Sequence, residues 1–311
     1  MEEGTALRRA GLTAPILIFG GLWNEQIKQY LECDLDITAS SADKLRAIDA
    51  AADTAGKRAR VHLKIDTGMG RIGVQHDRLP RFADAVLEAR HCDIIGVYSH
   101  FATAEEADQN FAMLQLERFN ASIEYLRSRG ISWRLTHMAN SAGLMNFPES
   151  HFDMVRPGLA LYGIVPDAAM EGVLPLRSVM RLTSKVVYFK VVETEQGISY
   201  GHRWRAPQQT RIVTVPVGYG DGYSRGLSGR AEVLIRGRRY PVVGSICMNQ
   251  MMVDVGADEA FNGDEVVLIG RQEHTGRSEE ITAAELAEKL GTTPHEILTN
   301  TNLRVPRIYL S

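Results

Sequence analysis

A segment rich in glycine and charge follows an apolar run in the first half of the chain, where a strand would end. This segment, KIDTGMGRIG, places Lys64 and Arg71 within eight residues of each other. Its glycines allow tight turns, and the planar guanidinium of Arg71 can pair with a carboxylate or a phenolate. A purely structural tight turn with a surface arginine would carry the same residues. The segment alone therefore does not decide between a functional loop and a structural turn.

Three later segments also follow strand-like runs and carry residues that could bind an anion or move a proton. They contain His100, then Ser141, then Arg156 with Gly158 and Leu159. The Ser141 hydroxyl and the backbone N–H groups of Gly158 and Leu159 could hold a phosphate, which β/α barrels commonly bind after their last strands. Structural turns and helix N-caps without any ligand would show the same residue types in these segments. A lone histidine is more often structural than catalytic, although its place after a strand favours a function for His100.

Two segments in the second half stand out by composition. In GYGDGY, glycines flank Tyr219 and would let the backbone approach closely while the phenol stays exposed. A tyrosine titrates near pH ~10, so its use as a base requires a cationic neighbour. The other segment, Cys247–Met252, reads by itself as a buried, sulfur-rich strand of the core.

The elements that must position these residues alternate between strand and helix up to about Pro175. The expected strands are Pro15–Phe19, Asp34–Thr38, Val61–Ile65, Ile94–Ser99, Arg134–Thr136 and, more weakly, Met154–Val155. The expected helices are Met1–Gly11, Ser40–Gly56, Asp77–Arg90 and Asp108–Arg129. Such alternation indicates parallel strands. It supplies about six strands, whereas a closed β/α barrel takes eight.

After Pro175 the pattern changes to short, closely spaced strands. These are Val186–Val192, Ile212–Val217, Ala231–Ile235, Tyr240–Val243, Met251–Val255 and Glu265–Ile269, followed by helices at Thr282–Leu290 and Pro294–Asn300. We therefore expect two domains, residues 1–175 with an α/β architecture and residues 176–311 with a mainly-β architecture.

Composition excludes several classes of protein. The 311 residues carry a net charge of −3, which favours neither nucleic acid nor anionic lipid as a partner. The helix-turn-helix-like stretch Ile281–Asn300 lacks the basic flank of a DNA-binding regulator. No apolar run approaches the ~20 residues of a membrane span. The acidic start does not resemble a signal peptide, and three scattered cysteines favour neither disulfides nor a metal site. We expect a cytoplasmic protein.

Taken together, the segments closely resemble alanine racemases. The matching stretches are VHLKIDTGMGRIGV, SHFATAEEAD, THMANSAG, DMVRPGLALYG, SYGHRW, VGYGDGYSR, GSICMNQMMVDV and LRVPRIY, in this order along essentially the whole chain. The resemblance implies a β/α (TIM-like) barrel followed by a mainly-β C-terminal domain. It implies a homodimer with pyridoxal 5'-phosphate as cofactor. It also implies interconversion of L- and D-alanine by two-base proton transfer on the cofactor aldimine, which supplies D-alanine for peptidoglycan.

The resemblance also implies roles for residues of the first domain. Arg156 matches the arginine that faces the pyridine nitrogen, and Arg71 matches the arginine near the cofactor phenolate and the substrate carboxylate. His100 matches the histidine that supports the catalytic tyrosine, and Lys64 matches a lysine that some members carry as a carbamate. The matched phosphate ligands are Ser141, Gly158 and Leu159.

Two residues of the second domain are implied to act in the partner subunit's site. Tyr219 matches the tyrosine that exchanges the substrate α-proton on the L side, and Met248 matches the residue whose backbone N–H binds the substrate carboxylate. Each would reach the barrel of the other protomer.

One departure from the family pattern concerns the cofactor-anchoring lysine. The family carries it in a Lys-x-x-x-Tyr-Gly-His-Gly segment at the end of the first strand, and this sequence has no such segment. We expect an N-terminally truncated barrel that lacks its first two strands. Three interpretations follow: a fragment of a working racemase, a non-catalytic cofactor-binding remnant, or a racemase for a larger amino acid.

Overall fold

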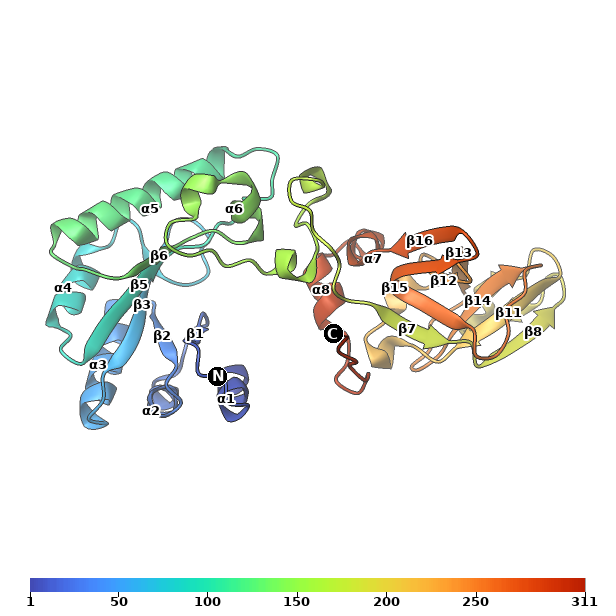
Figure 1. The fold of residues 1–311 in the computed structure, drawn as a ribbon, viewed down its shortest axis with the longest axis horizontal. Helices are drawn as coiled ribbons and strands as arrows, with labels where there is room; N and C mark the ends of the chain where they lie inside the picture. Colours follow the sequence, from blue (N-terminus) through green and yellow to red (C-terminus); the bar gives the residue numbers. More distant parts are fainter. Residues whose placement is uncertain (311) are drawn as a thin grey trace. The chain divides into compact units, whose positions relative to one another are not determined.

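The computed structural model describes residues 1–310, which divide into two compact units. The N-terminal unit comprises residues 1–158 and 165–174, and the C-terminal unit comprises residues 159–164 and the chain from residue 175 onward. The N-terminal unit is built on a parallel sheet, drawn mainly in blue and green in Figure 1. The C-terminal unit is built on an antiparallel sheet, drawn mainly in yellow and red (Figure 1).

The parallel sheet has six strands, five of them in the order β1-β2-β3-β5-β6, with β4 paired to β3. Their bounds are β1 Leu17–Ile18, β2 Asp36–Ala39, β3 Ala59–Asp66, β4 Val74–Gln75, β5 Cys92–Tyr98 and β6 Leu135–His137. A parallel bridge between His137 and Met154 extends the sheet past β6. The weak strand expected at Met154–Val155 is thus a single bridge. The half-barrel sheet confirms the fold class predicted for this part of the chain.

Six α-helices accompany this sheet: α1 Glu2–Arg9, α2 Ile27–Glu32, α3 Ala42–Thr54, α4 Pro80–Glu88, α5 Asn110–Ser128 and α6 Ser141–Asn146. Figure 1 shows α3, α4 and α5 along the outside of the curved sheet. Ser41 caps α3 because its hydroxyl accepts the N–H of Lys44 at 3.0 Å, and Pro80 opens α4 at a position that needs no N–H. The helices expected at 1–11, 40–56, 77–90 and 108–129 are confirmed, whereas α2 and α6 were not predicted.

The two faces of the parallel sheet differ in chemistry, because neighbouring residues of a strand point to opposite faces. One face carries apolar side chains such as Ile37 and Leu63, both fully buried. The other face carries polar side chains in register from strand to strand, with Thr38 beside His62, Lys64 beside Tyr98, and Tyr98 beside His137. The strands thus bring a row of polar groups from four segments onto one face.

The antiparallel sheet of the C-terminal unit has eight strands in the order β16-β15-β12-β13-β14-β11-β8, with β7 paired to β15. They are β7 Leu182–Lys185, β8 Tyr188–Val192, β11 Thr210–Val215, β12 Glu232–Ile235, β13 Arg238–Val243, β14 Met251–Gly256, β15 Glu265–His274 and β16 Arg277–Ile281. A separate ribbon pairs β9 Gly197–Ile198 with β10 Trp204–Arg205, and two helices follow the sheet, α7 Ala283–Leu290 and α8 Pro294–Thr299. Fully buried aliphatic side chains, among them Val233 and Val253, form its core. The expected β domain with a helical pair is confirmed, although β7, β9, β10 and β16 were not predicted.

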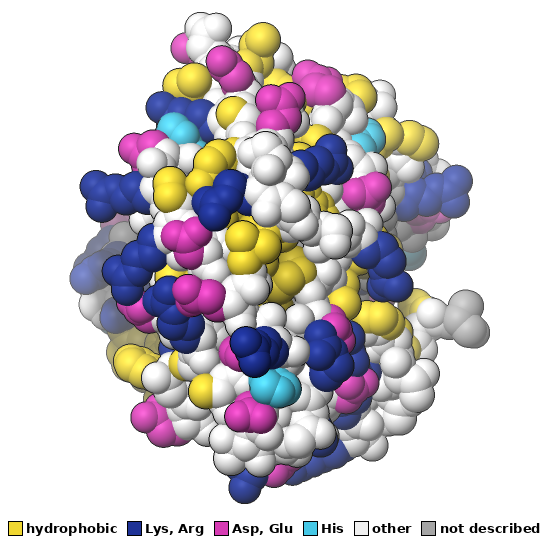
Figure 2. Space-filling view, turned by 90° about the vertical axis from the view of Figure 1, so that its left-hand side faces the viewer, with side chains coloured by type: hydrophobic (Ala, Val, Ile, Leu, Met, Phe, Trp, Pro, Cys, Tyr) yellow, Lys and Arg dark blue, Asp and Glu magenta, His cyan; other side chains and the backbone are white. Residues whose placement is uncertain are grey.

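Charged side chains of both signs are interspersed over the face drawn in Figure 2. On α3 and α4 they form exposed ion pairs, in which Asp43 contacts Arg81 at 2.7 Å and Arg46 contacts Glu88 at 3.3 Å. Such pairs contribute little to stability. Within residues 1–310, no helix combines the length and the apolar character needed to cross a membrane.

Leu45 on α3 and Leu87 on α4 allow a matched test of this packing, because Leu45 is fully buried and Leu87 is 52% exposed. We expect Leu45→Ala to lower the free energy of unfolding by about 3 kcal/mol, through lost burial and a residual cavity. Leu87→Ala should change it by less than about 0.5 kcal/mol. Urea titration of the full chain, followed by circular dichroism, measures both. Equal losses would contradict the assigned burial.

Candidate functional site

The polar face of the N-terminal sheet is tightly organised around the ring of Tyr98. Its hydroxyl lies 2.8 Å from Thr38 Oγ1, and its ring stacks on His137 with centroids 4.8 Å apart and planes inclined by 8°. The Lys64 ammonium lies 5.0 Å from the centroid of the same ring. Aromatic faces attract cations, so Tyr98 provides a stacking surface for the positive groups around it.

Arg156 is the centre of this cluster. Its Nη1 donates to His137 Nδ1 at 2.6 Å, and its Nη2 donates to the carbonyl oxygens of Ser99 at 2.7 Å and Met138 at 3.1 Å. Burial lowers its pKa to about 10, so the guanidinium stays charged at neutral pH. Among residues 1–310 no hydrogen bond starts from Nε, which leaves this N–H for another acceptor.

Two histidines beside Arg156 are held in the neutral state. Burial, followed by the positive charge of Arg156, lowers the pKa of His100 to about 3 and that of His137 to about 2. The Nδ1 atom of His100 lies 3.3 Å from Arg156 Nη2. A guanidinium can only donate, so the facing nitrogen of each ring must accept, and each ring carries its proton on Nε2.

Lys64 is a buried amine, with 3% of its surface exposed. Its Nζ donates to the Ile65 carbonyl oxygen at 3.1 Å. Burial, followed by the charges of Arg156 and Arg71, lowers its pKa to about 7, although Asp66 opposes the shift. In the described chain, no carboxylate forms an ion pair with Lys64, Arg71 or Arg156.

The loop that follows β3 is shaped by glycines and by one carboxylate. Asp66 accepts the N–H groups of Gly68 at 3.0 Å and Gly70 at 3.1 Å, which turns the chain back over the strand end. A side chain at Gly73, where φ is +123°, would place its Cβ 2.9 Å from Lys64 Cγ. This turn leaves Arg71 exposed, while its charge still acts on Lys64, Tyr98 and His100.

Ser141 opens α6 and is bound to the segment that follows Arg156. Its hydroxyl accepts the N–H of Gly158 at 2.9 Å, and Asn140 caps the helix by accepting the N–H of Gly143 at 2.8 Å. A Cβ added to Gly158 would meet nothing within 4 Å, so the space beside this backbone is open. Leu159 belongs to the C-terminal unit, where it is buried and begins a short 3-10 helix.

Tyr219 and Met248 are neighbours in the C-terminal unit. The N–H of Tyr219 donates to the Cys247 carbonyl oxygen at 3.1 Å, and the N–H of Gly220 donates to that of Met248 at 2.7 Å. The side chains of Tyr219 and Met248 are both exposed. The interpretation of Cys247–Met252 as a core strand is therefore wrong for residues 247–250, because the chain forms a loop until β14 begins at Met251.

Tyr200, which was not among the predicted site residues, lies beside the same loop. Its side chain is 71% exposed, and its carbonyl oxygen accepts the Ser245 hydroxyl at 3.4 Å. The backbone around it is left-handed at Ser199 (φ 65°), Gly201 (φ 72°) and His202 (φ 43°). Left-handed backbone at residues with a side chain costs free energy and clusters at functional sites. A tyrosine directly before a glycine, in the segment SYGHRW, was the available sequence signal.

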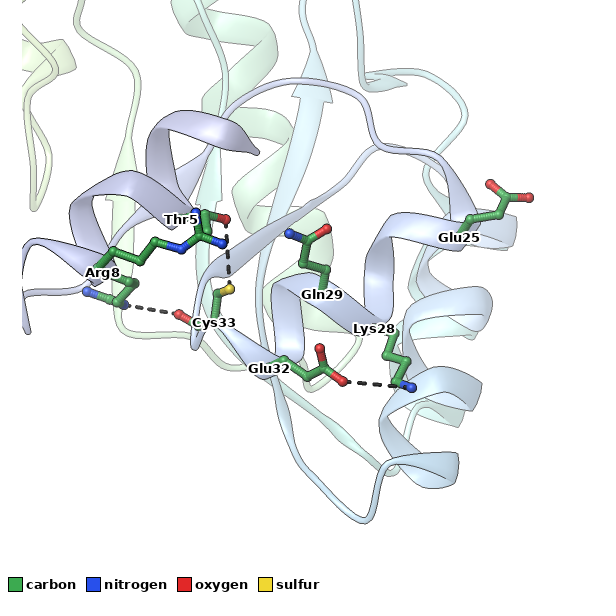
Figure 3. A pocket seen from close by; sticks show the side chains of 8 residues that line it. Thr5, Arg8, Glu25, Lys28, Gln29, Glu32 and Cys33 are labelled. Carbon is green, nitrogen blue, oxygen red and sulfur yellow. Dashed lines mark hydrogen bonds and ion pairs between the residues drawn. The ribbon is translucent and has the colours of Figure 1, made fainter.

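One hollow of the N-terminal unit lies away from this cluster, between α1 and α2. Figure 3 shows its lining, in which Arg8 donates to the Cys33 carbonyl oxygen at 3.1 Å and Lys28 pairs with Glu32 at 3.8 Å. Its volume is about 430 Å³. Cys33 precedes β2, so the hollow lies at the amino ends of the strands, whereas β/α folds bind ligands at the carboxyl ends. Among residues 1–310, no group of three or more His, Cys, Asp or Glu side chains could hold a metal ion.

The chain matches two family models that together cover most of its length. Residues 1–166 match the N-terminal domain of alanine racemase, and residues 179–309 match its C-terminal domain. The alanine racemase of Geobacter sulfurreducens is 41% identical over 315 residues, which cover 100% of this chain and 82% of that protein.

Solved structures agree with this match. Alanine racemase from Bacillus anthracis with bound L-Ala-P superposes with a TM-score of 0.92 at 35% identity, covering 100% of this chain and 80% of that chain. Histidine racemase from Leuconostoc mesenteroides subsp. sake superposes with a TM-score of 0.89 at 25% identity, covering 100% of this chain and 82% of that chain. Together with the two family models, these similarities show that the chain belongs to the alanine racemase family of isomerases.

Proposed function

We propose that this protein interconverts L-alanine and D-alanine with pyridoxal 5'-phosphate as cofactor, and so supplies D-alanine for peptidoglycan. The observation that carries the proposal is the buried cationic cluster of Lys64 and Arg156 at the carboxyl ends of the strands, which lacks a carboxylate partner within residues 1–310. Buried charges are ordinarily paired, so this cluster calls for an anionic ligand. The relatives named above support alanine as the substrate.

The donors present fit a planar, phosphorylated pyridine. The open space beside Gly158, next to the Ser141 hydroxyl, suits a phosphate, with the N–H of Leu159 next along the chain. The free Nε–H of Arg156 suits the lone pair of a ring nitrogen. When bound, pyridoxal phosphate supplies a conjugated ring that accepts the electron pair left when the substrate loses its α-proton.

Arg156 would act as a hydrogen-bond donor that does not give up its proton. Its pKa remains near 10 despite burial, so proton transfer from it to a ring nitrogen is unfavourable at neutral pH. The ring nitrogen that faces Arg156 would then stay unprotonated. An unprotonated nitrogen limits how much negative charge the ring can accept. Arg71, exposed on the loop after β3, would pair with the substrate carboxylate together with the backbone N–H of Met248.

A tyrosine of the C-terminal unit would move the α-proton, with His100 as its support. His100 is neutral with its proton on Nε2, so it can donate to a phenolate. The family resemblance assigns the proton transfer to Tyr219. The exposed phenol of Tyr200, in a left-handed backbone segment, supports Tyr200 as the stronger candidate.

Two other functions remain as outcomes of the same assays. The sequence has no lysine in a Lys-x-x-x-Tyr-Gly-His-Gly segment, which favours a non-catalytic, cofactor-binding protein as the second candidate. The match to a histidine racemase favours a test of larger substrates. We also propose a cytoplasmic homodimer in which each C-terminal unit serves the partner's site.

Tyr200→Phe and Tyr219→Phe test the assignment of the proton-moving group, because each removes only a hydroxyl. We expect one variant to lose about 10²–10⁴-fold in kcat for conversion of L-alanine to D-alanine, and the other to lose less than ~10-fold. Tyr188→Phe, at an exposed tyrosine on β8, is the control. Chiral chromatography of alanine and histidine after incubation with pyridoxal phosphate measures these rates.

Retained activity in both variants would rule out Tyr200 and Tyr219 as the proton-moving group. No conversion of any substrate by the wild type, with saturable pyridoxal phosphate binding, would instead establish the non-catalytic function.

A mixture of two inactive variants tests the shared site of the homodimer. Arg156→Ala removes a group of the N-terminal unit, and the inactive tyrosine variant removes one of the C-terminal unit. After subunit exchange, mixed dimers regain one intact site, so activity should recover to roughly a quarter of wild type, as expected for random pairing with one working site per mixed dimer. No recovery despite mixed dimers, shown by mass spectrometry of differently tagged subunits, would contradict this.

Lys64 gives the cationic cluster a measurable pH dependence in the absence of cofactor. Its pKa falls from its ordinary 10.5 to about 7 in the folded chain, so the folded state binds fewer protons than the unfolded state between these values. The contribution of Lys64 to stability should therefore rise with pH from about 7 to 9, by up to about 1.4 kcal/mol per pH unit.

Urea unfolding of the wild type and of Lys64→Met at several pH values measures this contribution as their difference. Lys28→Met, at an exposed lysine on α2, is the control and should run parallel to the wild type. A constant difference between wild type and Lys64→Met would contradict the buried amine.

A further inference from the structure

Three buried polar side chains continue from Arg156 away from the proposed cofactor site and across the sheet. His137 Nε2 lies 3.0 Å from His62 Nδ1, and His62 Nε2 lies 3.5 Å from Asp36 Oδ2. Asp36 Oδ1 accepts from Arg60 Nε at 2.6 Å. The row thus runs from Arg156 on the last segment of the sheet, through β6 and β3, to an arginine–aspartate pair.

Chemistry fixes the direction of every hydrogen bond in this row. Arg156 can only donate, so His137 accepts at Nδ1 and carries its proton on Nε2. His137 then donates to His62 Nδ1, which leaves the proton of His62 on Nε2, facing the Asp36 carboxylate. An ionised carboxylate can only accept. The donor Arg156 at one end and the acceptor Asp36 at the other therefore require all hydrogen bonds of the row to run in the same direction.

The row is sealed from solvent and fitted closely. Asp36, His62 and His137 are exposed by 3%, 2% and 0%. Burial by itself would raise the pKa of Asp36, but the hydrogen bonds from His62 and Arg60 outweigh it and lower this pKa, so the carboxylate stays ionised. A Cβ at Gly96 would lie 2.5 Å from His62 Nδ1, so a glycine makes the room for this ring.

We propose that Asp36, His62 and His137 form a one-directional hydrogen-bond relay that holds the Arg156 guanidinium in the orientation it needs to donate from Nε. Its members are positioning residues, since only Arg156 would touch the cofactor. The relay gives His137 a single tautomer, and that tautomer offers Arg156 an acceptor at a fixed place. The importance of this for racemisation rests on the proposed function, whereas the relay itself does not.

Histidine-selective ¹⁵N labelling of the full chain, without cofactor, reads the tautomers directly. We expect His62 and His137 each to show an acceptor-type Nδ1 and a protonated Nε2 at neutral pH. Substitution of single histidines assigns the signals. A proton on Nδ1 of either ring, or on both nitrogens of one ring, would overturn the relay.

His62→Leu and His62→Gln test what the relay does. Leucine removes both contacts, so the Nε2–H signal of His137 should lose its hydrogen-bonded shift, and kcat should fall about 10–100-fold, as when other supporting partners of active-site groups are removed. Glutamine can accept and donate at once, so it should restore most of the activity. His91→Leu, at a surface histidine 3.4 Å from Asp53, is the matched control.

Gly96→Ala provides a second route that keeps the His62 ring, because a Cβ there would lie 2.5 Å from His62 Nδ1 and 2.8 Å from the Leu135 carbonyl oxygen, so both the ring and the β6 backbone must shift. It should shift the His137 signal in the same direction as His62→Leu. An unmoved His137 signal in both variants, with kcat within twofold of His91→Leu, would overturn the positioning role. An inactive wild type with the expected tautomers would refute the proposed function and leave the relay standing.

Discussion

The site depends on one costly arrangement, a guanidinium buried at the carboxyl ends of parallel strands with no carboxylate partner among residues 1–310. Taking a charge out of water costs several kcal/mol unless other groups replace the solvent. Around Arg156 this replacement consists of carbonyl oxygens, two neutral histidines and the face of Tyr98. None of these groups cancels the charge. The positive potential remains available to an anion, and together with burial, which is the larger cause, it keeps the two histidines neutral.

Local patterns in the sequence were sufficient to predict most elements of the N-terminal unit. Runs such as Val61–Ile65 are apolar at the positions that pack against the helices, and Ser41 and Pro80 mark where two helices begin. The role of His62 could not be predicted in this way, because it depends on registers with β2 and β5 that span 24 and 34 residues. In the sequence, nothing distinguishes His62 from any other polar residue that interrupts an apolar run.

The C-terminal unit shows a second limit of local reasoning. Cys247–Met252 is apolar enough to suggest a strand, yet its first residues form a loop in which Cys247 accepts the backbone N–H of Tyr219 and its Sγ lies 3.7 Å from the Ser199 hydroxyl. Both partners lie far away in the sequence. The left-handed backbone around Tyr200 could not be predicted from composition either. Serine and histidine rarely adopt a positive φ, so nothing in the residue types of Ser199 and His202 indicates it.

Gly73 and Gly96 show where this chain would be least tolerant of inherited change. Neither carries a polar side chain, and neither would take part in the chemistry. Yet one added methyl group would strike Lys64 at the first position and His62 at the second. Selection on the function of the polar face therefore also acts on these two glycines, whose contribution is to leave room for the Lys64 and His62 side chains. A survey of natural variants should find them as restricted as the polar residues they accommodate.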